Sequence, residues 1–95
     1  MPVAVEQNFR GATIEQYDQI LEKMGLRPGG PTPPGAISHW VAKTSDGMRV
    51  VDVWESKEDF ERFAQAQIGP YAQEVGIDEE PETTFYDVHN YLIRS

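Results

Sequence analysis

The sequence predicts an α+β fold of the ferredoxin-like βαββαβ type, with one antiparallel four-stranded sheet. Two observations lead to this prediction. Residues 48–63 join an apolar strand directly to an amphipathic helix, and each half of the chain follows the same strand–helix–strand plan. Right-handed crossovers then place the first and third strands in the centre of the sheet and the second and fourth at its edges. Both helices are expected to cover one face.

The joint in the middle of the chain has the clearest pattern. Residues 49–54 are mostly β-branched or aromatic and predict the third strand. Ser56 is the expected N-cap of the second helix, with Asp59 as its capping-box partner. Gly69-Pro70 is expected to interrupt this helix and to start a short one that runs to Val75. The second helix carries one apolar stripe, made of Phe60, Phe63, Ala64 and Ile68.

The first strand and helix follow from alternation and capping. Residues 2–9 alternate in polarity, which predicts the first strand, and Gly11 ends it. Thr13 is the expected N-cap of the first helix, with Gln16 as its capping-box partner. Apolar residues recur at helical spacing as far as Met24.

The remaining segments are loops and two further strands. Residues 27–35 hold four prolines and three glycines, so they form a loop that is either a stiff connector or a lid. Residues 36–44 predict the second strand, joined to the third by a turn at 45–47 in which Gly47 supplies a positive φ. Residues 84–93 alternate and predict the fourth strand.

Composition limits the possible functions. Ninety-five residues suffice for one domain, spanning 1–95, with a modest core. The chain has no cysteine, so it offers neither a disulfide nor a thiolate metal ligand. A net charge of −8 argues against binding nucleic acid or anionic membranes. No apolar run is long enough to span a membrane and no leader pattern is visible. We therefore expect a cytoplasmic protein.

The uncovered face of the sheet predicts an oligomer. With both helices on one face, the other face has no cover within the chain, although strand residues on both faces are apolar or aromatic. A second copy of the chain is the simplest cover. We therefore expect a homodimer.

Several local features of the chain occur together in one known group of proteins. They are the strand that ends in Val53-Trp54, the following segment 55–58 with its helix, the His39-Trp40 strand, the Asp46-Gly47 turn and the segment 88–90. In these features the chain resembles the antibiotic-biosynthesis-monooxygenase-type domains of the dimeric α+β barrel superfamily. This resemblance implies that two sheets pack face to face and that each subunit holds a small-molecule pocket between sheet and helices.

The resemblance also implies a chemistry. Some members of the superfamily oxidise aromatic, polyketide-like substrates without metal or flavin, because the deprotonated substrate itself reacts with oxygen. We therefore expect no cofactor and no metal, a small aromatic ligand, and a cofactor-independent monooxygenase-like activity. Two alternatives remain open: a non-enzymatic ligand-binding or interaction module, and a non-oxidative cyclase or isomerase. Whether the chain is an enzyme at all is left uncertain.

The haem-degrading branch of the superfamily fits the sequence poorly. That branch uses an asparagine near the end of the first strand, a tryptophan on the second helix and a histidine about three turns later. Asn8 matches the first of these, but Phe63 and Glu74 stand near the other two positions. The proximal haem ligand is therefore missing.

His39 and His89 are the only histidines and are candidate catalytic residues. On opposite edge strands they would lie about 14 Å apart, since neighbouring strands are about 4.8 Å apart. This separation excludes a shared metal ion within one subunit. A structural, hydrogen-bonded role is the alternative for each.

The other candidates are aromatic or polar. Tyr17 on the inward face of the first helix is a candidate catalytic phenol or a core residue. Asp52 lies in the middle of an apolar strand, where it forms an ion pair with Arg49 or Lys43 or acts as a general base. The candidate substrate-binding residues are Trp54, Phe63, Tyr71 and Asn90.

Overall fold

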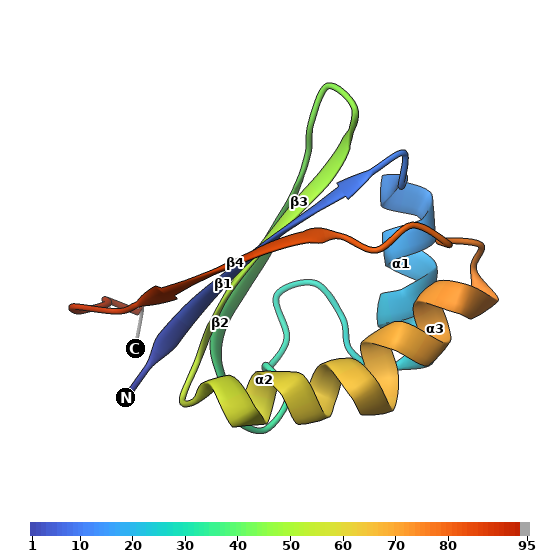
Figure 1. The fold of residues 1–95 in the computed structure, drawn as a ribbon. Helices are drawn as coiled ribbons and strands as arrows, with labels where there is room; N and C mark the ends of the chain where they lie inside the picture. The colour runs from blue at the N-terminus through green and yellow to red at the C-terminus, as the bar shows by residue number, and fades with distance from the viewer. Residues whose placement is uncertain (94–95) are drawn as a thin grey trace.

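The structure, a computed structural model, describes residues 1–93 and has the predicted α+β architecture (Figure 1). One antiparallel sheet has the strand order β2-β3-β1-β4, which confirms β1 and β3 as the central strands. Its strands are β1 (Val3–Arg10), β2 (Ala36–Lys43), β3 (Gly47–Trp54) and β4 (Glu82–Asp87), and its helices are α1 (Ile14–Lys23), α2 (Lys57–Phe63) and α3 (Gly69–Glu74). The helices form a layer on one side of the sheet (Figure 1).

Alternation along the strands decides which side chains meet the helices. Every second residue of β1 from Val3 to Phe9 is buried, and so is every second residue of β3 from Met48 to Trp54. This face carries two separate apolar clusters, one around Phe9 and Met48 and one around Val5 and Trp54.

Two buried polar side chains separate the clusters. Gln7 lies between Val5 and Phe9 on β1, and Asp52 lies between Val50 and Trp54 on β3. Only 6% of Gln7 and 5% of Asp52 is exposed. Burying polar groups in place of apolar ones costs stability unless they have partners. The interruption of the core is therefore the first structural sign of a functional site.

The helix starts confirm the capping predictions. Thr13 and Gln16 form a reciprocal capping box at α1. The Ser56 hydroxyl accepts a hydrogen bond from the backbone N–H of Asp59 at α2. The Asp59 carboxylate, however, pairs with Arg62 instead of completing the box.

The predicted break at Gly69-Pro70 is wrong. Helices α2 and α3 are joined without interruption by a π-helical turn, η1 (Ala64–Ile68), and form one long helix along the edge of the molecule (Figure 1). The backbone N–H of Gly69 donates to the carbonyl of Ala64, five residues earlier. This wider turn lets the chain accept Pro70, which has no N–H to donate, inside a continuous helix.

Two predictions about the sheet also need correction. Gly47 has no positive φ; it is glycine because a Cβ there would overlap the carbonyl oxygen of Phe9 on the neighbouring strand. The fourth strand spans Glu82–Asp87, not residues 84–93, because β1 ends its pairing with β4 at Val3–Asp87. The following segment projects away from the helical layer, close to the N-terminus (Figure 1).

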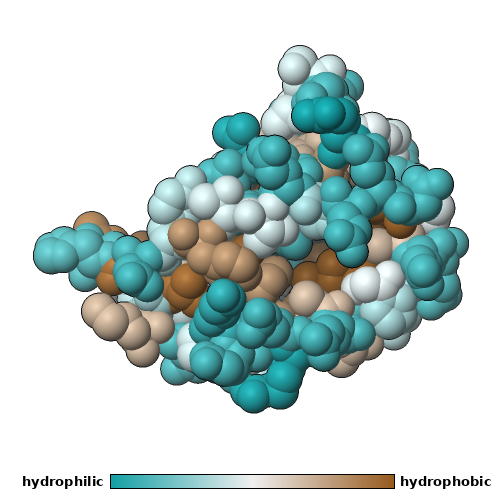
Figure 2. All heavy atoms as spheres, in the orientation of Figure 1, coloured by the Kyte–Doolittle hydropathy of each residue, from teal (hydrophilic) through white to brown (hydrophobic). Residues whose placement is uncertain are grey.

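The placement of exposed apolar side chains also follows from the position of the helices on one side of the sheet. Apolar side chains reach the surface between β4 and α2 (Figure 2), where the rings of Phe60 and Phe85 meet edge to face at 5.8 Å. On the face of the sheet without helices, Trp40 and Tyr86 are each 51% exposed. Among residues 1–93, no helix has both the length and the apolar character needed to cross a membrane.

Candidate active site

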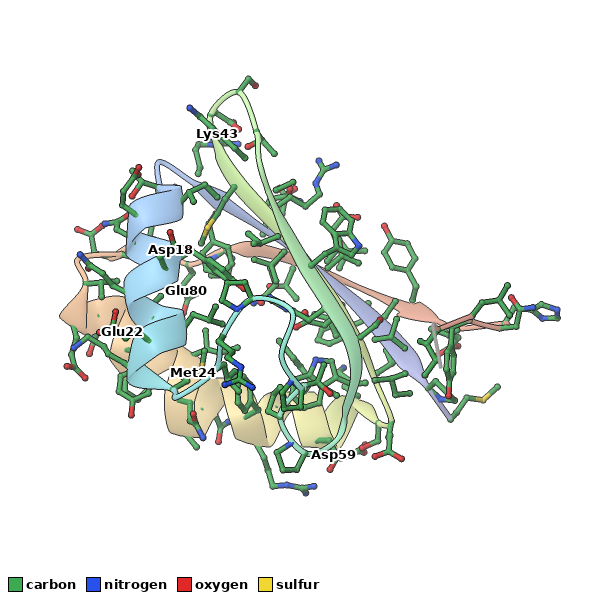
Figure 3. All side chains as sticks on the ribbon, turned by 180° about the vertical axis from the view of Figure 1, so that it is seen from behind. Asp18, Glu22, Met24, Lys43, Asp59 and Glu80 are labelled. Atoms are coloured by element: carbon green, nitrogen blue, oxygen red, sulfur yellow. The ribbon has the colours of Figure 1, made fainter. Side chains whose placement is uncertain are left out.

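A cavity of about 360 Å³ lies between the helix-covered face of the sheet and the helical layer. Its walls come from strands β1, β2 and β3, from α1, from the long helix and from the loop after α1. In Figure 3 this loop arches between α1 and β2, with Asp18 and Met24 labelled on the α1 side. The proline- and glycine-rich loop therefore forms a wall of the cavity, with Leu26 to Pro33 lining it.

The lining is mainly apolar and aromatic, and three of its polar side chains lie together. A hydrogen-bonded chain runs from Tyr17 on α1 to His39 on β2 and on to Asp52 on β3. The Tyr17 hydroxyl lies 2.5 Å from His39 Nε2, and His39 Nδ1 lies 2.5 Å from Asp52 Oδ1. All three residues line the cavity.

The sheet register brings His39 and Asp52 together. They are direct partners across the antiparallel β2–β3 pair, so their side chains leave the sheet on the same face. The indole N–H of Trp54 donates to the second oxygen of Asp52 at 3.2 Å. The carboxylate is therefore held from both sides, and its partners are His39 and Trp54.

The expected ion pair of Asp52 with Arg49 or Lys43 is wrong. Arg49 lies on the other face of β3, where it donates to Asn8 at 2.8 Å and lies 3.9 Å from Glu6. Adjacent strand residues point to opposite faces, and so Arg49, three positions from Asp52, cannot reach it. The carboxylate instead orients an imidazole, which is the arrangement that a general base requires.

The hydrogen-bonded chain Tyr17–His39–Asp52, called the relay below, indicates which of its atoms carry protons. A carboxylate can only accept, so His39 Nδ1 carries a proton toward Asp52, and Nε2 is left facing the Tyr17 hydroxyl. The Tyr17 hydroxyl then donates to Nε2. Burial, together with the negative charges of Asp52 and Asp18, raises the pKa of Tyr17 to about 12. Tyr17 therefore keeps its proton at neutral pH.

Other predicted site residues divide into two groups. Trp54 and Phe63 line the cavity, with ring centroids 5.3 Å apart. Tyr71 packs against the apolar cluster around Phe9 and does not line the cavity. His89 and Asn90 lie beyond the end of β4, exposed to solvent and away from the cavity lining. The structure therefore does not bring His89 to His39, because the fourth strand ends before it.

Gln7 is a cavity residue that the sequence analysis missed. Its signal was present, since Gln7 falls in register with Val3, Val5 and Phe9 on the buried side of the alternating first strand. Within residues 1–93, no group of three or more histidine, cysteine, aspartate or glutamate side chains is arranged to hold a metal ion.

Comparison with known proteins shows likeness in structure only. No family model and no curated protein sequence matches the chain. Rv0793 from Mycobacterium tuberculosis superposes with a TM-score of 0.65 at 14% identity, covering 96% of this chain and 98% of that one.

Two oxygenases are also similar in structure. SnoaB, a cofactor-independent oxygenase from Streptomyces nogalater, has a TM-score of 0.57 at 16% identity and covers 98% of this chain and 97% of its own. The monooxygenase ActVA-Orf6 of Streptomyces coelicolor, whose structure contains nanaomycin D, has a TM-score of 0.51 at 20% identity over 99% of this chain and 92% of its own. This chain therefore has the same α+β fold as these three proteins, as its resemblance to the antibiotic-biosynthesis-monooxygenase-type domains implies.

Proposed function

We propose that this protein is a cofactor-independent monooxygenase-like enzyme that acts on a small aromatic or polyketide-like metabolite. The observation that carries the proposal is the Tyr17–His39–Asp52 relay on the wall of a largely apolar cavity. Trp54 and Phe63 supply aromatic walls of the kind that hold a planar ring system. The likeness in fold to two proteins described as oxygenases agrees with this assignment.

The relay accounts for the first chemical step. A phenolic or enolic hydroxyl of the substrate donates its proton to the Tyr17 oxygen, while Tyr17 passes its own proton to His39 Nε2. Asp52 stabilises the imidazolium that forms, because the ion pair lies in a site of low polarity. The product of this step is an electron-rich substrate anion.

Oxygen then reacts with the anion. One electron passes from the anion to dioxygen, and the two radicals combine to form a carbon–oxygen bond. The protonated relay returns its proton to the resulting peroxide, and loss of water leaves a new carbonyl group. For a phenol with a free ring C–H, the sum is phenol plus dioxygen giving quinone plus water. The protein supplies the base and the orientation.

A non-oxidative isomerase or cyclase is the second candidate. The relay contains a proton acceptor and a proton donor within hydrogen-bond distance of each other, which is sufficient for moving a proton from one substrate atom to another. A module with a cavity filled by side chains is disfavoured, because Trp54 and Phe63 leave about 360 Å³ open.

The test is turnover with and without oxygen. Hydroxylated naphthalenes are incubated with the purified protein, and oxygen uptake, quinone formation and substrate loss are followed. Oxygen-dependent quinone formation that requires His39 supports the monooxygenase. Turnover that persists under nitrogen supports the isomerase or cyclase, and no turnover in either gas counts against both enzymes.

We also propose that the protein is a homodimer that pairs through the face of the sheet without helices. Trp40 and Tyr86 stand half-exposed there, on opposite edge strands, around the partly buried Val51 and Val53. Half-exposed aromatic side chains gathered on one face of a sheet are typical of a contact surface.

A further inference from the structure

Gln7 is a buried polar side chain without a partner. It is 94% buried, and no atom of residues 1–93 forms a hydrogen bond with its carboxamide. Every fully enclosed side-chain nitrogen or oxygen in this part of the chain does have a hydrogen-bond partner. The Gln7 carboxamide must therefore open into the cavity that it lines. An unpaired amide in a largely apolar site costs free energy unless a ligand satisfies it.

The position of Gln7 relative to the relay sets the size of that ligand. Gln7 is paired with Val50 on β3, two residues along from Asp52, whereas His39 lies on β2 opposite Asp52. Two strand spacings and one two-residue step separate the backbones of Gln7 and His39 by about 12 Å. Both side chains extend from the same face, and the Tyr17 ring stacks on the His39 ring with centroids 5.9 Å apart. A ligand that contacts both the Gln7 carboxamide and the Tyr17 hydroxyl must therefore span about two fused rings.

The charges of the lining restrict the ligand further. The cavity is lined by the carboxylates of the exposed Asp18 and the buried Asp52, and among residues 1–93 the only lysine or arginine in the lining is the exposed Arg27. An anionic ligand would be repelled from the interior. The ligand that fits is neutral before it gives up its proton.

We propose that Gln7 recognises the end of the substrate opposite the hydroxyl group that meets the relay, by donating a hydrogen bond to a carbonyl oxygen there. This inference rests on the proposed function, because it takes the relay as the group that removes the hydroxyl proton. In a conjugated hydroxy ketone the negative charge created at the hydroxyl end spreads to the carbonyl oxygen. A carboxamide N–H at that oxygen stabilises the anion as it forms. The substrate class is therefore a neutral, planar, bicyclic or larger hydroxy ketone with the two groups at opposite ends.

The experiment compares two probes that differ in one group. The first is a naphthol that carries an acetyl group at the far end of the ring system, and the second is the same naphthol with an ethyl group there. Their affinities for the intact protein are measured by calorimetry under nitrogen, so that no oxidation takes place. The wild type is expected to bind the acetyl compound about tenfold more tightly than the ethyl compound.

Variants assign that preference to Gln7. Gln7→Met keeps the volume but removes the donor, so it should bind the ethyl compound as the wild type does and lose the preference. Gln7→Asn keeps a carboxamide and should retain part of the preference, which guards against a folding defect as the cause. A preference that survives in Gln7→Met, equal loss of both affinities, or no binding of either probe by the wild type would overturn the proposal.

The outcome for Gln7 is separable from that of the proposed function. Probe discrimination that depends on Gln7, without any turnover, would refute the enzyme and keep Gln7 as a ligand contact. Oxygen-dependent turnover without a carbonyl preference would refute only the role of Gln7.

Discussion

His39 and Asp52 face each other across strands β2 and β3, with Nδ1 and Oδ1 2.5 Å apart. The side chain of Asp52 is 7% exposed and that of His39 is 31% exposed. The pair thus has a sheltered carboxylate at its base and an imidazole that reaches into the cavity. This asymmetry suits a base that acts through Tyr17, since the carboxylate end of the pair is fixed and the other end of the imidazole lies 2.5 Å from the Tyr17 hydroxyl.

Asp52→Asn should abolish most of the activity while leaving the fold intact. The amide has nearly the shape of the carboxylate, but it neither stabilises the imidazolium nor enforces the Nδ1–H tautomer. We expect kcat to fall by a factor of about 100 or more. Turnover of a hydroxynaphthalene checks this, with Asp46→Asn in the exposed hairpin turn as the control. Equal kcat values for the two variants would contradict a catalytic relay.

Trp54→Phe tests whether the indole positions Asp52. Phenylalanine keeps an aromatic ring in the core but cannot donate to Asp52 Oδ2. We expect kcat to fall about threefold to tenfold with KM nearly unchanged, and the free energy of unfolding to fall by about 1–3 kcal/mol. A rise in KM with constant kcat would show that Trp54 only contacts the substrate.

Tyr17 should ionise last among the four tyrosines. Burial, followed by the charges of Asp52 and Asp18, raises its pKa to about 12 from an ordinary value of 10.0. The change in ultraviolet absorbance on tyrosinate formation should therefore include a late step near pH 12 in the wild type. The Tyr17→Phe variant should lack this step, and Tyr86→Phe, with its exposed ring, should keep it.

The same pKa shift predicts how stability depends on pH. The folded state holds the Tyr17 proton more tightly than the unfolded state, so its contribution to stability is complete below pH 10 and is lost between pH 10 and 12. Half-burial and solvent screening reduce this contribution to about 1–2 kcal/mol. Urea unfolding should show that the wild type loses this much more stability than Tyr17→Phe across that interval. Parallel curves would disprove the assignment.

The homodimer should dissociate when charge is placed on the proposed contact face. Trp40→Glu removes a half-exposed indole from that face and adds a negative charge there. We expect a dimer for the wild type and a monomer for the variant in sedimentation experiments. Gln73→Glu adds the same charge on the exposed side of α3 and should remain dimeric. A wild type that sediments as a monomer would refute the homodimer.

Gly47→Ala should be strongly destabilising because its Cβ would overlap the carbonyl oxygen of Phe9. We expect a loss of about 2–4 kcal/mol in the free energy of unfolding, as for other steric overlaps in a packed interior. Gly69→Ala is the matched control, since its Cβ meets only the Ala64 carbonyl at 3.4 Å and alanine favours helix. Similar losses in the two variants would show that the overlap at Gly47 is relieved elsewhere.

The sequence by itself determined the order of the elements, the central strands and the helix caps. These depend on local patterns: alternation in residues 3–10 and the side-chain caps at Thr13 and Ser56. It also singled out His39 and His89, because histidine is the usual acid–base residue at neutral pH, and Tyr17, because its phenol falls on the inward face of the first helix. What local pattern could not supply was the end of β4 at Asp87, which depends on where its partner strand β1 begins.

Only the tertiary structure decided which of the candidates act together. The identity of the partner of Asp52 depends on the strand register: the sequence pointed to Arg49 or Lys43, and the β2–β3 pairing brings His39 to it instead. Register and facing direction are set by how two distant strands pair, and a shift of one residue would turn Asp52 to the other face. The cavity is likewise a property of packing, because Gln7 and Asp52 separate two apolar clusters that come together only when the sheet meets its helices.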